Sequence, residues 1–310
     1  MTFVMNAAIL LDIPILRETV VFIFLSLVPG FAILKLFKFE NLTLLDTSIF
    51  SVALSIAFVM FDSLLVNQVF LFLGLAQPLT IVPLTLSLSV FTLIAFIITS
   101  FRHDLPKAKI KKTFKIKKNY LPLAIILPIL PLLSAMSVLY YNVGTLLLSC
   151  AIIAVLCVMS AVFRSIFPEE LFPILIFSIS LCLVFQFILT STHVLGYDAN
   201  LEYYVFRTTQ LNGHWSSLDA SINSVATLNY GSMLSITLLP AVYSTLMGVQ
   251  AEVIFKIFYP LIFCLVPVAL FRINENQFGK IIGLMSALFF SFTFVAFFSP
   301  EPLSLNRQII

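Results

Sequence analysis

Uninterrupted apolar runs of about 18 residues or more recur along this 310-residue chain. A helical run of that length matches the thickness of the hydrocarbon core of a bilayer. Membrane-spanning β-strands are shorter and alternate apolar with polar side chains, a pattern that this sequence lacks. Charged residues make up only 10% of the chain, against about 25% in soluble domains. The sequence therefore predicts an all-α fold, a polytopic transmembrane helical bundle.

The apolar runs predict about eight spans. Residues 3–16 are also apolar, but they are too few for a span and predict a partial or interfacial helix. Asp62 lies in the middle of a predicted span, where we expect it to make an interhelical hydrogen bond. The predicted spans lie near 18–38, 46–75, 80–100, 121–141, 145–163, 171–190, 250–271 and 281–298.

One strongly basic segment orients these spans. Residues 101–120 read FRHDLPKAKIKKTFKIKKNY and hold eight of the 17 basic residues. The positive-inside rule places such a loop in the cytoplasm. Spaced lysines also suit nucleic acid or anionic lipid, but a topology determinant at the surface of the cell membrane is the favoured interpretation. Nucleic acid is therefore not an expected partner, whereas membrane lipids are.

Counting helices from that loop places the segment 191–249 outside the cytoplasm. Within it, YGSMLSITLLPAVYSTLMGV (230–249) is apolar enough to span. We expect it instead to lie in the outer interface, or to dip into it, because five polar side chains make it partly amphipathic: Ser232, Ser235, Thr237, Tyr243 and Ser244. This choice keeps Arg272 and Lys280 in a short cytoplasmic loop.

The four cysteines, Cys150, Cys157, Cys182 and Cys264, all lie in apolar runs. None belongs to a CxxC pair or lies beside a histidine at metal-ligand spacing, so we interpret them as buried apolar residues.

The polar segment 191–217 interrupts the apolar sequence. Asp198 is a suitable N-cap for a helix that runs to about Leu211 and stops at Asn212-Gly213. Asp198 and Glu202 are four residues apart and share one helix face, where like charges repel unless a cation or a proton lies between them. The segment suits two interpretations: a solvated loop with Trp215 anchored at the interface, or a functional carboxylate pair.

The order of these elements resembles the N-terminal half of the GT-C integral-membrane glycosyltransferases, from about residue 171. An outward span is followed by GYDANLEYYVFRTTQLNGHW, an apolar stretch, an inward span, a short basic loop, an outward span and FFSPEP. Tyr230-Gly231 stands where that family often has Tyr-Pro-Pro, and Glu301 where a second acidic motif commonly follows. FIFLSLVPG, YDANLEYY, KIFYPLIFCLVPVALFR and LNRQ also resemble an uncharacterised archaeal family of polytopic membrane proteins with such a glycosyltransferase-like half.

The resemblance implies transfer of a sugar from a polyprenyl-phosphate-linked donor on the extracytoplasmic face. It implies that Asp198 is the base or a metal ligand, that Glu202 and Glu301 are further catalytic candidates, and that Asp198 and Glu301 hold Mg²⁺ or Mn²⁺. Further substrate-binding candidates, basic or aromatic side chains, are Lys256, Arg207, His214, Tyr203 and Arg307.

The resemblance divides the chain into an N-terminal helical region, 1–165, and a partial GT-C-like region, 166–310. A GT-C module has seven or more spans and this region supplies three, so we expect a C-terminal half or a partner subunit to supply the others. Two alternatives stay open: a non-catalytic membrane assembly subunit, and a component of a lipid or solute transporter.

Overall fold

The computed structural model of this chain describes residues 1–39, 42–101, 120–139, 143–162, 168–189, 193–194, 197–216 and 230–298. In those ranges the regular structure is helical and contains no strand, which confirms the all-α prediction. Five helices in the same ranges are long and apolar enough to cross a membrane, which indicates a membrane-embedded protein; the count of eight spans stays a prediction. The five are Leu16–Leu36, Leu44–Phe72, Ile81–Thr99, Glu169–Gln186 and Ala251–Phe278.

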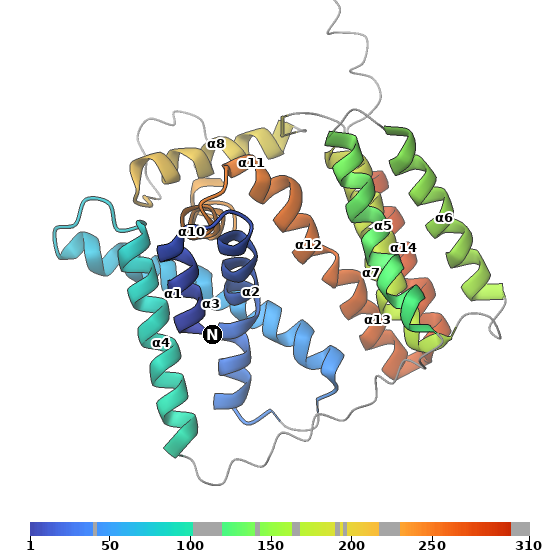
Figure 1. Cartoon of the computed structure of the whole chain (residues 1–310), viewed down its shortest axis with the longest axis horizontal. Coiled ribbons are helices and arrows are strands. Elements are labelled where there is room, and N and C mark those ends of the chain that lie inside the picture. The colour runs from blue at the N-terminus through green and yellow to red at the C-terminus, as the bar shows by residue number, and fades with distance from the viewer. Residues whose placement is uncertain are drawn as a thin grey trace, which may run out of the picture. The chain divides into compact units, whose positions relative to one another are not determined.

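The helices form two compact units that alternate along the chain (Figure 1). The first unit comprises residues 1–113 and 197–255, and the second comprises residues 114–196 and 256–310. The predicted regions 1–165 and 166–310 follow the resemblance rather than these units, and they stay predictions.

In the first unit, α1 (Thr2–Leu11) packs against α2 (Leu16–Leu36) and α4 (Ile81–Phe101), and α2 packs along α3 (Leu44–Phe72). The α2–α3 contact is close because Gly30 has no side chain, and a Cβ there would collide with the backbone carbonyl of Ser51. The Gly30 N–H donates to Ser55 Oγ at 2.7 Å. This bond ties α2 to α3 beside Pro29, where a proline inside a helix disturbs the ordinary backbone ladder.

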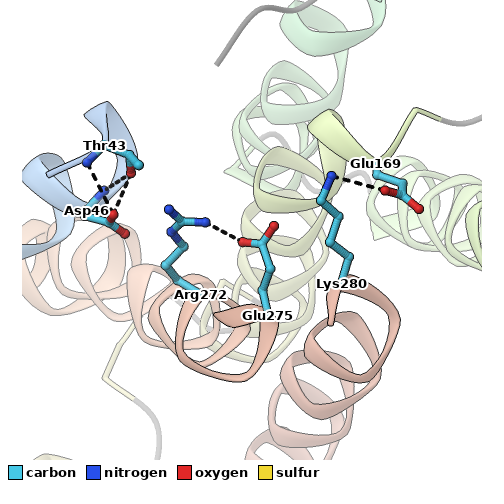
Figure 2. A network of polar contacts seen from close by, with 6 residues as sticks. All are labelled: Thr43, Asp46, Glu169, Arg272, Glu275 and Lys280. Atoms are coloured by element: carbon cyan, nitrogen blue, oxygen red, sulfur yellow. Dashed lines mark hydrogen bonds and ion pairs between the residues drawn. The ribbon is translucent and has the colours of Figure 1, made fainter. Parts of the chain in front are cut away.

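Two polar arrangements fix α3. A capping box starts it: Asp46 N–H donates to Thr43 Oγ1 at 3.2 Å, and Thr43 N–H donates to Asp46 Oδ2 at 3.4 Å (Figure 2). Further along the helix, Ser87 Oγ of α4 donates to Asp62 Oδ1 at 2.5 Å. The expected interhelical hydrogen bond of Asp62 is thus confirmed.

The remaining elements of the first unit are α8 (Tyr197–Asn212), α10 (Leu238–Met247) and α11 (Ala251–Val253). α10 packs against α2, α3 and α4, and α8 lies across it (Figure 1). With 10 residues, α10 is about 15 Å long, half the thickness of the hydrocarbon core. Nine of its ten residues are buried, so α10 is enclosed by neighbouring helices. Its expected position at the outer interface of the membrane stays a prediction.

In the second unit, α7 (Phe172–Ile188) packs against α5 (Leu121–Leu139), α6 (Val143–Val162), α13 (Leu265–Phe278) and α14 (Lys280–Phe298), and also contacts the short α12 (Tyr259–Phe263). Lys280 Nζ, at the start of α14, lies 3.1 Å from Glu169 Oε2 in the 3₁₀ turn η2 (Glu169–Leu171) that precedes α7 (Figure 2). Because of this ion pair, the turn between α13 and α14 lies at the same end of the unit as η2. The predicted cytoplasmic side of the Arg272–Lys280 loop stays a prediction.

Candidate functional site

Helix α8 carries the two carboxylates of the predicted site. Asp198 is exposed and lies in the first turn of the helix, one residue inside the start and not at the predicted cap position. Glu202 follows one turn later and is half-buried. Burial raises the pKa of the Glu202 carboxyl, and the negative charge of Asp198 raises it further. Glu202 therefore holds a proton more readily than an ordinary glutamate.

Tyr203 follows Glu202 directly on α8 and packs against two phenylalanine rings. Its ring centroid is 6.0 Å from that of Phe206 and 5.8 Å from that of Phe255, both in edge-to-face contacts. Burial raises the pKa of Tyr203, the charge of Glu252 on α11 raises it further, and the charge of Arg207 lowers it. Glu252 thus acts on the same site, although it is not among the residues predicted from the sequence.

Polar contacts hold α8 on α10. Arg207 donates to Gln210 Oε1 at 2.5 Å, and Gln210 Nε2 donates to Ser244 Oγ of α10 at 2.7 Å. Ser244 Oγ in turn donates to the carbonyl of Val249 at 2.8 Å. The apolar part of the contact is a buried cluster of Phe206, Ala241 and Ala251. The carboxylates of α8 are therefore mounted on a helix whose rotation is limited by packing and by hydrogen bonds.

The end of α8 is fastened to α3. The Asn67 side chain is fully buried and pairs reciprocally with the backbone of Trp215: Asn67 Nδ2 donates to the Trp215 carbonyl at 2.9 Å, and the Trp215 N–H donates to Asn67 Oδ1 at 2.8 Å. The indole N–H of Trp215 donates to the carbonyl of Gly231 at 2.9 Å. Gly213 ends α8 with φ +66°, as the sequence predicts, and its carbonyl accepts a hydrogen bond from Leu79 N–H at 2.9 Å. Trp215 is therefore held through its backbone by Asn67 of α3 and through its indole N–H by the carbonyl of Gly231.

Arg17 of α2 caps the C-terminal end of α10. Its guanidinium donates to the carbonyls of Leu246 at 2.9 Å and Thr245 at 3.1 Å, which are orphan acceptors at the C-terminus of α10. It also pairs with Asp12 at 2.5 Å. Gly248 closes α10 with φ +72°, and a Cβ there would lie 2.9 Å from the guanidinium carbon of Arg17. Neither Arg17 nor Asn67 is among the predicted site residues, because each acts on a segment far away in the sequence.

The other predicted residues are not all brought to the α8 carboxylates. His214 lies beyond the opposite end of α8, whose last residue, Asn212, is about 15 Å from Glu202 along the helix axis. The Nδ1 atom of His214 is 3.2 Å from the Asn212 carbonyl. Lys256 belongs to the second unit and is 9% exposed, within a π-helical turn, η3 (Ile254–Phe258). Glu301 and Arg307 lie outside the described residues.

The donor set on α8 fits a hard divalent cation only in part. Mg²⁺ and Mn²⁺ take oxygen ligands, and Mg²⁺ commonly binds through one or two carboxylates together with substrate phosphates. Asp198 and Glu202 would supply two such carboxylates. In the part of the chain that the structure describes, no group of three His, Cys, Asp or Glu side chains is arranged to hold a metal ion.

Comparison with protein-family models, curated proteins and solved structures found no match to this chain. The chemistry of the site is therefore argued from its residues. A half-buried carboxylate, an exposed carboxylate one turn away, a partly desolvated tyrosine and an arginine share one rigidly mounted helix. Such a set is suited to remove a proton from a hydroxyl and to bind an anionic or polar ligand beside it.

Proposed function

We propose that this chain is an integral-membrane glycosyltransferase, or the N-terminal part of one, that transfers a sugar from a polyprenyl-phosphate-linked donor on the extracytoplasmic face. The observation that carries the proposal is the half-buried Glu202 carboxylate, whose pKa is raised by burial and by Asp198. A carboxylate of raised pKa is a stronger base when it is ionised, and the acceptor hydroxyl must lose its proton as it attacks the sugar.

The long apolar helices suit a lipid-linked donor. The polyprenyl chain of such a donor stays in the bilayer, whereas its phosphate and sugar reach the polar boundary. We propose that the exposed Arg207 faces the donor phosphate, where a guanidinium stabilises the charge of the leaving group. Bound Mg²⁺ or Mn²⁺ would add positive charge beside Asp198. Roles for Lys256, His214, Tyr203, Glu301 and Arg307 in the same reaction stay predictions.

The experiment is a transfer assay on the protein reconstituted in lipid vesicles. A panel of radiolabelled polyprenyl-phosphate monosaccharides is offered, and label entering lipid or glycan products is counted for wild type, Glu202→Gln and Asp198→Asn. Glu170→Gln is the matched control because Glu170 is an exposed glutamate of the second unit. We expect wild-type transfer, an unchanged control, and a loss of about 100-fold or more in Glu202→Gln, the scale of general-base catalysis.

Two results contradict the proposal. Equal transfer by wild type and Glu202→Gln would remove the carboxylate from the mechanism. Wild-type transfer no higher than that of protein-free vesicles, across the whole donor panel, would show that this chain alone is not the enzyme. That second result favours the non-catalytic membrane subunit over the glycosyltransferase.

A further inference from the structure

Two cysteines of the second unit meet between neighbouring helices. Cys150 of α6 and Cys182 of α7 are separated by 32 residues in the sequence, yet their Sγ atoms are 3.0 Å apart. Both thiols are free. The two sulfurs of a disulfide are about 2.05 Å apart, so a shift of roughly 1 Å brings the pair to bonding distance. α6 and α7 pack along each other in the same unit, which keeps the pair together.

Polar groups surround this pair inside an otherwise apolar contact. Ser149 Oγ lies 3.3 Å from Cys182 Sγ, and Cys150 Sγ donates to Gln186 Oε1 at 3.5 Å. Cys182 is 1% exposed, whereas Cys150 is only half-buried. An oxidant therefore reaches the pair through Cys150. Both residues lie in the middle portions of long apolar helices, so that oxidant must be soluble in lipid.

We infer that Cys150 and Cys182 form a reversible disulfide that joins α6 to α7. Two S–H bonds break, one S–S bond forms, and two electrons and two protons pass to the oxidant. A lipid-soluble quinone accepts these and leaves as the quinol. The inference rests on the second unit alone and is independent of the proposed glycosyltransferase activity.

The other two cysteines provide the controls. Cys157 follows Cys150 by seven residues on the same helix, about 10.5 Å along its axis, so these two cannot bond. Cys264 is buried, and its thiol is also free in the structure. The chain has four cysteines in all, so the number of free thiols shows whether one pair has formed, and cysteine variants identify which pair it is.

The test counts free thiols before and after oxidation in membranes. The probe is diamide, a membrane-permeant azo compound that takes up the two electrons and two protons and becomes a hydrazine. After denaturation, the thiols are labelled with a maleimide polymer and counted by gel shift. Wild type should fall from four labels to two, and return to four on reduction. Cys157→Ser should fall from three to one, whereas Cys150→Ser should stay at three.

The inference is overturned if wild type keeps four labels, or if Cys150→Ser loses two labels as Cys157→Ser does. A second measurement does not depend on any variant. Arg164 lies between the two cysteines in the sequence, so trypsin applied to the denatured, oxidised wild type separates them. The fragments carrying Cys150 and Cys182 should migrate together without reductant and apart with it; fragments that separate in both conditions exclude the disulfide.

Discussion

Replacing Asn67 by leucine tests whether the polar segment after α8 is clamped to α3. Leucine has the same branched skeleton of four side-chain heavy atoms as asparagine but removes both hydrogen bonds to Trp215, at 2.9 and 2.8 Å. A backbone donor or acceptor that loses a buried partner costs about 1–3 kcal/mol. Trp215 is only partly buried, so water takes over part of the loss, and the low end of that range applies to each group. We expect about 2 kcal/mol, or roughly a 30-fold rise in the undocked population of the segment.

Intrinsic tryptophan fluorescence measures this change directly, because Trp215 is the only tryptophan of the chain. Asn67→Leu should shift the tryptophan emission to longer wavelength and increase its quenching by acrylamide, with helical circular dichroism unchanged. Gln68→Leu is the matched control, since it makes the same kind of replacement at the next, exposed position of α3. If Asn67→Leu and Gln68→Leu give the same emission and quenching as wild type, the reasoning about the clamp is wrong.

Three further changes have outcomes that follow from the structure. Gly248→Ala should destabilise the protein by about 2 kcal/mol or more, because a side chain strains the left-handed residue and collides with Arg17. Gly74→Ala places a side chain at a positive φ without a collision and should cost about 1 kcal/mol, as thermal unfolding in detergent would show. Gly30→Ala should cost about 3 kcal/mol or abolish folded expression, because the new methyl meets the α3 backbone; normal expression and melting would contradict this. The raised pKa of Glu202 means that its stability contribution is fully present below about pH 4.3, the ordinary pKa of glutamate, and is lost as pH rises through the raised pKa. Glu202→Gln should remove that part of the pH dependence, which melting curves between about pH 4 and 7 would detect.

The parts of the fold that depend on neighbouring residues could be predicted from the sequence. The long helices follow from apolar runs, and α8 follows from the polar pattern that ends at Gly213. The hydrogen bond of Asp62 follows from the cost of an isolated carboxyl in a span, although its partner Ser87 does not.

The parts that depend on distant residues could not be predicted. Asn67 and Trp215 are 148 residues apart, and Arg17 and Leu246 are 229 apart. Nothing local in a single sequence indicates that such residues meet. The composition of α10 does not indicate that α2, α3, α4 and α8 surround it and bury nine of its ten residues. The effect of Glu252 on the pKa of Tyr203 cannot be predicted from the sequence either, since it requires α11 to lie near α8.

The interleaving of the two units has an evolutionary consequence. The backbone that follows α8 is held by Asn67 and the end of α10 by Arg17, so the sequence of the N-terminal helices cannot diverge independently of these segments. In related sequences, position 248 should be free to lose its glycine only where position 17 is no longer arginine, since the two share one space. Position 67 should keep an amide wherever the backbone after α8 follows the same path. The N-terminal helices and the segment around α8 should therefore vary together, and recombination that exchanges one without the other would separate α8 and α10 from the side chains that hold them.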